Sequence, residues 1–395
     1  MANSPIVATS VVQHQDVEPM PGMIIKDNMD IDGDNLASKP GQFSDCCNFC
    51  QVTQGCVAYA WNDYQGGTCW LKSANGPIRK NNGVKIGFLN SGSSDYRLKK
   101  SYEGNNFFDA FDFWTNGDPT HGFVDYVDRP TAERTGLISI INGKVKISAD
   151  SDNQIPHGKR GRPSIRIHSK DSYNEGLFLF DIDHMPTGPG TWPAYWLVGD
   201  NWPNNGEADI LEGVGGDNFN HFALHTKNGC RMPEQDQSLF TGKWATGKNG
   251  RPATNCYVYE SAQWDNQGCS ISSPDGFFGD EFNSGQGGVF AFEWDRGGYM
   301  RTWIFKRNQI PSDILQSNPN PSNWGKPIAY FKLGENCTPS HFNAMKIIIN
   351  LTFCGDWAGH VYPGGMSACI DKVRNNPEAY KNAYWLINYV KVFDH

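Results

Sequence analysis

Residues 206–213 place three carboxylates, Glu207, Asp209 and Glu212, in a run that is otherwise built from Gly, Ala, Ile and Leu. Apolar neighbours on both sides favour a strand inside a sheet over a solvated run of charges. Side chains two residues apart in a strand share a face, so Glu207 and Asp209 point the same way. Glu212 joins them only if one extra residue, a β-bulge, separates it from Asp209.

Like charges side by side on a sheet repel each other, so this arrangement would not stabilise a sheet with a purely structural role. Cleavage of a glycosidic bond needs it, because one carboxylate must attack while one carboxylic acid protonates the leaving group. Side chains two pleat steps apart lie about 6–7 Å from each other at the backbone, and rotamers can bring the carboxyls to the roughly 5–5.5 Å of a retaining enzyme. Asp209 can hydrogen-bond Glu207 and help to separate the pKa values of the two glutamates. The alternatives are a calcium site and an edge-strand cluster of charges.

Aromatic motifs flank the carboxylates. Residues 190–196 read Gly-Thr-Trp-Pro-Ala-Tyr-Trp, Trp202 precedes a proline, and residues 350–357 read Asn-Leu-Thr-Phe-Cys-Gly-Asp-Trp. With these flanks the chain resembles glycoside hydrolase family 16, most of all its laminarinase branch, the endo-β-1,3(4)-glucanases with the strand motif E-x-D-x-x-E. The resemblance runs from about Phe107 to the C-terminus. Ala208 replaces the usual Ile or Val, and since this position faces away from the carboxylates we expect a difference in packing alone.

The resemblance implies roles for single residues. It makes Glu207 the nucleophile and Glu212 the general acid/base, an order that spacing alone does not give. The candidates for substrate binding are Trp192, Trp202, Trp357, His225 and Arg166. For the tryptophans the alternative is core packing, and we place Trp196 in the core. His225 could assist Glu212 or bond a sugar hydroxyl, with a structural histidine as the alternative. Arg166 could reach a hydroxyl or Glu207, with an exposed strand arginine as the alternative.

The composition restricts the partners. The chain has 395 residues, enough for one large and one small domain. Charged residues make up 19% and aromatic residues 13%, a bias typical of sugar-binding clefts, although aromatic side chains also fill β cores. A formal net charge of −8 argues against a nucleic-acid partner. No apolar run reaches the roughly 18 residues of a membrane-spanning helix, so we expect no membrane partner.

Cysteines and sequons indicate an extracellular protein. The sequence contains 11 cysteines, and Asn336 and Asn350 each begin a glycosylation sequon. Asn350 lies in an apolar strand, where a glycan fits badly. The first residues lack the pattern of a secretory signal, so we expect a secreted protein whose signal peptide is not present in this chain.

The N-terminal part of the chain is rich in cysteine. Residues 1–20 are polar and we expect them to be disordered. Residues 21–98 include Asp-Cys-Cys-Asn-Phe-Cys at 45–50 and Gly-Gly-Thr-Cys-Trp-Leu-Lys at 66–72. These pieces resemble a PAN/Apple-like module, a small disulfide-rich α+β domain. The resemblance implies that the module binds carbohydrate or protein.

The same resemblance implies that cysteines on a short helix bridge to Cys56 and Cys69. Cys50 is one partner, and the choice between Cys46 and Cys47 for the other stays open. Five cysteines leave one free thiol. Zinc is the alternative ligand, disfavoured because the block lacks a nearby histidine and paired C-x-x-C knuckles.

The second part of the chain reads as all-β. After a short polar link at residues 99–106, residues 107–395 show many short strands and almost no helical periodicity. A β-sandwich follows, and the family resemblance narrows it to a concanavalin-like jelly roll. Its six cysteines suggest three disulfides of unknown connectivity. The predicted strands and hairpins cover 136–148, 164–168, 176–183, 193–198, 208–214, 221–225, 289–310, 346–353 and 384–393.

The sequence therefore predicts a retaining endo-β-glucanase that cleaves β-1,3- or mixed β-1,3/1,4-glucan through a covalent glycosyl-enzyme intermediate. One alternative is a transglycosylase, in which a sugar hydroxyl intercepts that intermediate. A second is a non-catalytic glucan-binding protein, although such proteins typically lose the glutamates. We expect a monomer that requires no cofactor. Family members often carry a structural calcium ion away from the cleft, and nothing in the sequence locates one.

Overall fold

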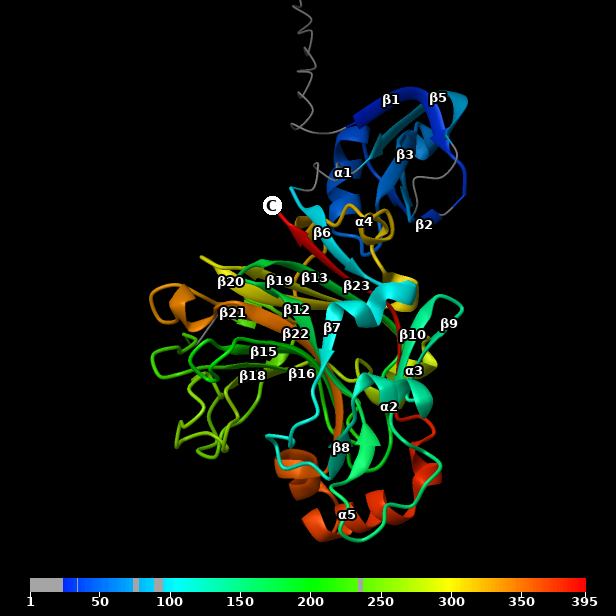
Figure 1. Cartoon of the computed structure of the whole chain (residues 1–395). Coiled ribbons are helices and arrows are strands. Elements are labelled where there is room, and N and C mark those ends of the chain that lie inside the picture. The colour runs from blue at the N-terminus through cyan, green and yellow to red at the C-terminus, as the bar shows by residue number, and fades with distance from the viewer. Residues whose placement is uncertain (1–23, 34, 74–77, 89–94, 234–236) are drawn as a thin grey trace, which may run out of the picture. The chain divides into compact units, whose positions relative to one another are not determined.

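The computed structural model describes residues 24–33, 35–73, 78–88, 95–233 and 237–395 (Figure 1). The chain divides into two compact units, Met1–Ser93 and Ser94–His395. The segment 1–20 that the sequence predicts to be disordered lies outside the described residues. Within the described residues, no helix is long and apolar enough to cross a membrane.

The described residues of the N-terminal unit form an antiparallel five-stranded sheet with the helix α1 (Phe43–Gln51) packed against it. The strand order is β1-β5-β3-β4-β2. The strands are β1 (Ile24–Ile31), β2 (Asn35–Pro40), β3 (Ala58–Asn62), β4 (Thr68–Lys72) and β5 (Ile78–Phe88). One helix on one sheet is the predicted α+β arrangement.

Two disulfides fasten α1 of this unit. Cys46 bonds Cys69 on β4, and Cys50 bonds Cys56 just before β3. The predicted partners are confirmed, and the open choice falls on Cys46, which lies one helical turn before Cys50 on the same face. Cys47 keeps a buried free thiol, and burial raises its pKa. Four sulfurs are consumed in disulfides, so the zinc alternative is wrong.

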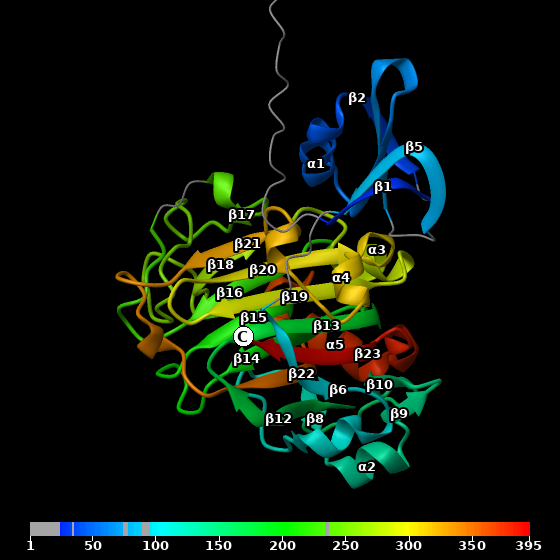
Figure 2. The same cartoon turned by 90° about the horizontal axis from the view of Figure 1, so that it is seen from above.

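The C-terminal unit is a sandwich of two antiparallel eight-stranded sheets, seen from two directions in Figures 1 and 2. The first, here called the β13 sheet, has the order β21-β20-β19-β13-β23-β10-β9, and β6 also pairs with β23. The second, the β15 sheet, has the order β17-β18-β16-β15-β14-β22-β12-β7. The prediction of an all-β sandwich is confirmed.

The strands of the β13 sheet are β6 (Arg97–Tyr102), β9 (Ile138–Ile141), β10 (Lys144–Ser148), β13 (Gly176–His184), β19 (Gly288–Asp295), β20 (Tyr299–Lys306), β21 (Ala329–Lys332) and β23 (Tyr384–Asp394). Those of the β15 sheet are β7 (Phe111–Phe113), β12 (Arg166–Tyr173), β14 (Thr191–Val198), β15 (Glu207–Glu212), β16 (His221–His225), β17 (Lys243–Trp244), β18 (Cys269–Ser272) and β22 (Met345–Phe353). Outside the sheets lie the pair β8 (Val124–Tyr126) and β11 (Arg162–Ser164) and the helices α2 (Arg129–Arg134), α3 (Gly279–Ser284), α4 (Ser312–Leu315) and α5 (Gly365–Asn375).

Alternating residues of the two sheets meet in one core. Phe180 of β13 stacks on Tyr195 of β14 with ring centroids 4.0 Å apart, and both side chains are fully buried. Ala208, Ile210 and Leu211 of β15 join the same core. The carboxylates of β15 therefore lie on the opposite face of that sheet. The three disulfides expected in this unit are formed by Cys230–Cys337, Cys256–Cys269 and Cys354–Cys369.

The residues predicted to link the two blocks belong to the sandwich instead. Strand β6 pairs with β23, where Tyr102 lies opposite Val390. The 3₁₀ helix Gly104–Ala110 follows and buries Phe107 in the core. The prediction of a link was wrong because residues 99–102 belong to β6 and residues 104–106 begin the 3₁₀ helix.

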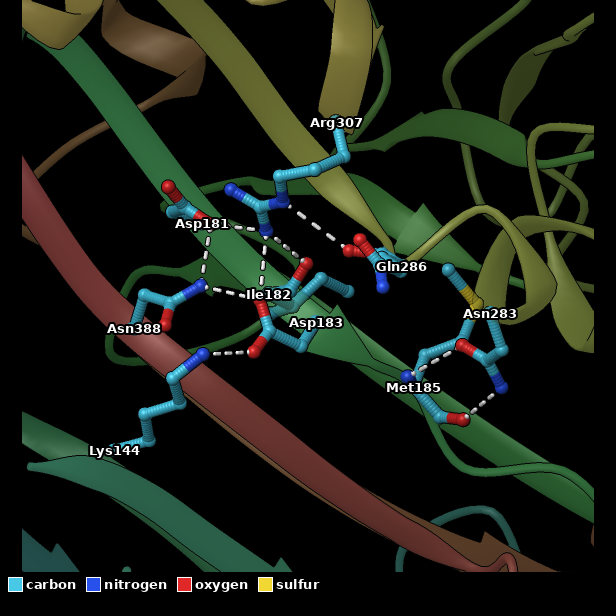
Figure 3. A network of polar contacts seen from close by, with 9 residues as sticks. All are labelled: Lys144, Asp181, Ile182, Asp183, Met185, Asn283, Gln286, Arg307 and Asn388. Carbon is cyan, nitrogen blue, oxygen red and sulfur yellow. Dashed lines mark hydrogen bonds and ion pairs between the residues drawn. The ribbon is translucent and has the colours of Figure 1, made fainter. Parts of the chain in front are cut away.

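The face of the β13 sheet that points away from the core carries a network of charges (Figure 3). Asp181 and Asp183 stand two residues apart on β13, and Nη2 of Arg307 lies 2.6 Å and 3.0 Å from their Oδ1 atoms. Asn388 of β23 donates to the same two oxygens at 2.8 Å and 2.7 Å. Lys144 of β10 also pairs with Asp183. Each carboxylate in this network thus meets a cation and an amide.

Candidate active site

A bulge in β15 shapes the site. Against β14, Glu207 pairs with Val198 and Asp209 with Trp196, but the next pair is Leu211 with Tyr195. Ile210 is therefore the extra residue, and Glu212 returns to the face of Glu207 and Asp209. The predicted bulge is confirmed. Ala208 packs in the core, as expected of a position that faces away from the carboxylates.

His225 of β16 lies beside two of the carboxylates. It pairs with Glu207 across the strands, and its Nε2 lies 4.0 Å from Glu207 Oε1 and 3.1 Å from Asp209 Oδ2. Side-chain exposure is 15% for Glu207, 8% for His225 and 4% for Asp209, so the group is largely removed from water. The third carboxylate, Glu212, accepts a hydrogen bond of 2.8 Å from Trp192 Nε1.

Burial disfavours the charged form of all three carboxylates. Burial, and after it the nearby charge of Asp209, raises the pKa of Glu207, and burial raises the pKa of Asp209. Burial and Asp209 raise the pKa of Glu212 to about 7, against the hydrogen bond from Trp192, which lowers it. Closely spaced carboxyls titrate as a group, so at neutral pH the array holds protons as well as charge. An acid and a base can then coexist on one face.

Two of the predicted substrate-binding tryptophans meet at the Glu212 end of this face. Trp192 packs edge-on against Trp357 with ring centroids 5.5 Å apart. Trp357 lies in the π-helical turn Gly355–Gly359 that follows β22, and it also contacts His221 at 4.8 Å. The Cys354–Cys369 disulfide fastens the start of that turn to α5.

Arg166 lies between two indole rings. Its Cζ is 4.9 Å from the ring of Trp114 and 5.0 Å from that of Trp196. Its Nε donates to Nε2 of His168 at 2.9 Å, and burial lowers the pKa of His168 to about 3, which keeps that ring a neutral acceptor. Arg166 is buried, so the alternative of an exposed strand arginine is wrong.

Trp196 is on the carboxylate face, and its prediction as a core residue was wrong. It pairs with Asp209 and donates from Nε1 to Asn350 Oδ1 at 2.7 Å. Trp196 has the same parity in β14 as Trp192, so alternation alone assigns both to one face. Asn350 is buried, which agrees with discounting it as a glycan acceptor.

Trp202 takes a different position from the other candidates. It lies in the turn between β14 and β15 and its residue exposure is 40%. Two further residues near the carboxylates, Asn220 and His221, gave no sequence signal. Asn220 contacts the backbone of β15, and the rings of His221 and Trp357 meet in a T-shaped arrangement. Single polar residues in a turn and a strand start are too common to be recognised from sequence.

Three residues on this face have the chemistry of metal ligands. Within the described ranges, Glu207, Asp209 and His225 could together ligate a metal ion, since their ligand atoms lie within 4.8 Å of one another. Glu212 stands outside that group, although the bulge brings it to the same face.

The fold and this array define a glycosidase. Residues 111–393 match the family model described as the XgeA-like catalytic GH16 domain, and the chain belongs to glycoside hydrolase family 16. Residues 29–72 match the PAN domain model. Both resemblances drawn from the sequence are thereby confirmed.

Named relatives agree with this assignment. A probable glycosidase of Schizosaccharomyces pombe is 43% identical over 304 residues, which are 76% of this chain and 70% of that protein. An endo-1,3(4)-beta-glucanase of Arthroderma benhamiae is 42% identical over 311 residues, 76% of this chain and 65% of that protein. Relatives from Aspergillus niger and Aspergillus clavatus are longer, and the chain spans 41% and 47% of their lengths.

Solved structures share the sandwich. An elongating family 16 beta-1,3-glucosyltransferase superposes with a TM-score of 0.69 at 38% identity, over 76% of this chain and 100% of that one. Laminarinase 16A of Phanerochaete chrysosporium, solved with 6-O-glucosyl-laminaritriose in its donor and acceptor sites, gives the same TM-score and identity over 76% and 99%.

Proposed function

We propose that this protein is a retaining endo-β-glucanase that hydrolyses β-1,3- or mixed β-1,3/1,4-glucans. The observation that carries the proposal is the bulge in β15, which gathers Glu207, Asp209 and Glu212 on one largely buried face. The name of the Arthroderma benhamiae relative and the glucan bound to Laminarinase 16A support the substrate class.

The proposed reaction proceeds in two displacements. The Glu207 carboxylate attacks the anomeric carbon while the protonated Glu212 gives its proton to the departing glycosidic oxygen. Glu212, now ionised, takes a proton from water, whose oxygen attacks the anomeric carbon and releases Glu207. Each cycle consumes one water and restores both glutamates. The reaction uses carboxylates and water alone, so it requires no cofactor.

Neighbouring side chains hold the reacting groups and the sugar. His225 lies beside Glu207 and Asp209, and its proximity lowers the pKa of Glu207 against the larger effects of burial and of Asp209. Asp209 lies between the glutamates and disfavours their simultaneous ionisation. Trp192 and Trp357 offer ring faces and edges to pyranose C–H groups, and Arg166 and Trp202 extend the binding surface.

Transglycosylation is the second candidate function. The observation that favours it is the likeness to the solved beta-1,3-glucosyltransferase, whose whole chain is covered. Both functions share the glycosyl-enzyme on Glu207, and they differ in whether water or a sugar hydroxyl attacks it. A non-catalytic glucan-binding role is disfavoured because both glutamates are present.

We further propose that the protein is secreted and acts as a monomer. Five disulfides among the described residues suit an oxidising compartment. We also propose that the N-terminal unit binds carbohydrate or protein. If its ligand is the glucan, the second site raises the effective concentration of enzyme on an insoluble polymer.

Parallel digestion of laminarin, lichenan, xyloglucan and agarose tests the proposal. We expect short oligosaccharides from laminarin or lichenan, and NMR should show the β-anomer before mutarotation. Release of the α-anomer first would disprove the covalent route, and cleavage of xyloglucan or agarose alone would disprove the substrate class. Longer products in the presence of oligosaccharide acceptors would favour the transglycosylase.

A further inference from the structure

The bulge that gathers the carboxylates leaves backbone groups of β15 without a strand partner. Pairing with β16 stops at Asp209 opposite Ala223, so residues 210–212 have no strand on that side. Ile210 is fully buried, and a buried backbone group without a hydrogen-bond partner destabilises the folded state. The register of β15 therefore depends on what replaces the missing strand.

Asn220 replaces it. Its Oδ1 accepts the N–H of Glu212 at 3.1 Å, and its Nδ2 donates to the carbonyl of Ile210 at 3.0 Å. The second hydrogen of Nδ2 goes to the carbonyl of His221 at 3.0 Å. Since a backbone N–H only donates and a carbonyl only accepts, these partners fix the orientation of the amide.

Asn220 is itself held rigidly. Its residue exposure is 0%, and its backbone N–H donates to Ser273 Oγ at 2.8 Å. The backbone N–H of Ser273 returns a bond of 2.8 Å to the carbonyl of Asn220. A single side-chain amide thus spans the bulge from a fixed support and satisfies the two backbone groups on either side of Leu211.

We propose that Asn220 is the positioning residue for the general acid/base, because its amide locks the bulge that turns Glu212 toward Glu207. A strand whose register moves by one residue turns its side chains to the other face, and for Glu212 that face is the apolar core. The inference rests on the proposed function of Glu212 as acid/base. It adds that the acid is held through its backbone, by a residue that never touches the sugar.

The test uses the full chain with Asn220→Ala and a matched control, Asn283→Ala. Asn283 of α3 makes the same kind of contact with the residue that follows β13. Its Oδ1 accepts from the N–H of Met185 at 2.9 Å and its Nδ2 donates to the carbonyl of Met185 at 2.9 Å (Figure 3). Both variants lose an amide that bridges buried backbone. Only one of the two amides lies beside Glu212.

Leaving-group dependence is the main measurement. Glucan has a poor leaving group and needs the acid, whereas an aryl β-laminaribioside with a 2,4-dinitrophenolate leaving group does not. We expect Asn220→Ala to lower kcat on laminarin about 100-fold with KM nearly unchanged, the loss that misplacement of a catalytic group causes. Its kcat/KM on the aryl glycoside should stay within about threefold, because the first displacement then needs no acid. Asn283→Ala should show no such contrast.

Rescue by azide is a second measurement of the lost acid/base function of Glu212. Azide attacks the anomeric carbon of the glycosyl-enzyme without a general base, forms the C–N bond as the bond to Glu207 breaks, and yields a β-glycosyl azide. We expect azide to accelerate turnover of the aryl glycoside by Asn220→Ala and to leave the wild type unchanged. Equal losses on both substrates without azide rescue would reduce Asn220 to an ordinary structural residue and overturn the proposal.

Amide hydrogen exchange separates this proposal from the proposed function. Exchange across residues 210–213 should be faster in Asn220→Ala than in the wild type and unchanged in Asn283→Ala. Unchanged exchange would overturn the locking role whatever the substrate is. If Asn220→Ala does not fold, Asn220→Asp keeps the shape of the side chain but loses the donors to Ile210 and His221, and the same contrasts apply. If the wild type cleaves no glucan but Asn220→Ala still shows faster exchange, the proposed glucanase function is refuted. The proposal that Asn220 holds the bulge then still stands.

Discussion

Strands β13 and β15 each carry two carboxylates two residues apart on one face, yet their surroundings are opposite. Asp181 and Asp183 meet the guanidinium of Arg307, the ammonium of Lys144 and the amide of Asn388. On β15, by contrast, Glu207 and Asp209 have the imidazole of His225 beside them, and a third carboxylate, Glu212, lies on the same face. The spacing of acids in a strand therefore does not mark a reactive site. A shortage of matching cations around buried acids, as on β15, does mark one.

The difference has an energetic meaning. Charges removed from water are tolerated where partners compensate them, as on β13. On β15 compensation is incomplete, and the pKa values of Glu207, Asp209 and Glu212 rise because burial disfavours their charged forms. Such groups reduce stability but exchange protons near neutral pH, which acid–base catalysis requires.

The largest expected effect is on kcat, which should fall for substitutions in β15 and not for a substitution in β13. Glu207→Gln and Glu212→Gln should each lower kcat on laminarin by about 1,000-fold or more, because a nucleophile or a general acid is lost. Asp181→Asn should leave kcat within about twofold, since its carboxylate faces away from the sugar. Steady-state rates on purified, folded proteins decide this.

A rescue experiment identifies which glutamate attacks. Azide should restore turnover of an activated aryl glycoside by Glu207→Ala and give the α-glycosyl azide, because it replaces the missing nucleophile from the same side. A β-azide from this variant would exchange the roles of Glu207 and Glu212.

The next effect is on stability, and here a substitution in the β13 network should matter while activity does not change. Arg307→Met removes the cation shared by Asp181 and Asp183 and should lower the free energy of unfolding by about 2–3 kcal/mol. The estimate is reduced from that of a fully buried pair because the Arg307 side chain is 26% exposed. Denaturant titration measures the change, and kcat per folded molecule should stay the same. A stable Arg307→Met protein would mean that the β13 network is not needed to hold the sheet.

A smaller effect concerns the pH dependence of stability. The folded pKa of Glu212, about 7, lies above its ordinary value, so its neutral form is favoured in the folded state. The stabilising contribution of neutral Glu212 is fully present below the pKa that this residue has in the unfolded chain. It is lost as the pH rises toward and through 7. Glu212→Gln should flatten the fall in melting temperature between roughly pH 4.5 and 7.5. A steeper fall in the variant would contradict the raised pKa.

The smallest effect tests the hydrogen bond from Trp192 to Glu212. That bond stabilises the ionised carboxylate, so Trp192→Phe should raise the pKa of Glu212 further. The first displacement needs protonated Glu212, and kcat/KM falls as pH rises through its pKa. The alkaline limb of the pH profile should therefore move to higher pH in the variant. Movement to lower pH would show that another group controls this limb.

Sequence patterns predicted those parts of the molecule that repeat a local rule. The long strands β13 and β22 are nearly continuous apolar runs, and β23 alternates between apolar and polar residues. The bulge in β15 follows from three acids that must share a face. Short strands such as β7, β17 and β21 were missed, because two to four residues are too few to show a period. Trp196 was misplaced although its parity with Trp192 contained the answer.

Contacts between distant segments could not be predicted. The stacking of Arg166 between Trp114 and Trp196 depends on three segments that only the folded sheet brings together. The bonds from Asn220 to β15 depend on where the pairing with β16 stops, which no local pattern records. Each of these residues has an ordinary sequence context, and its importance arises from geometry.

The position of β23 has a consequence for biosynthesis. This strand, Tyr384–Asp394, lies between β13 and β10 and pairs Phe178 with Val392. A ribosome must therefore translate the entire sandwich before β13 acquires its second neighbour. Until then the nascent chain exposes an apolar strand that is paired on one side alone. Such a chain aggregates readily unless chaperones bind it. Premature termination anywhere before residue 384 removes the central strand and should yield an insoluble product, even though Glu207 and Glu212 are already present.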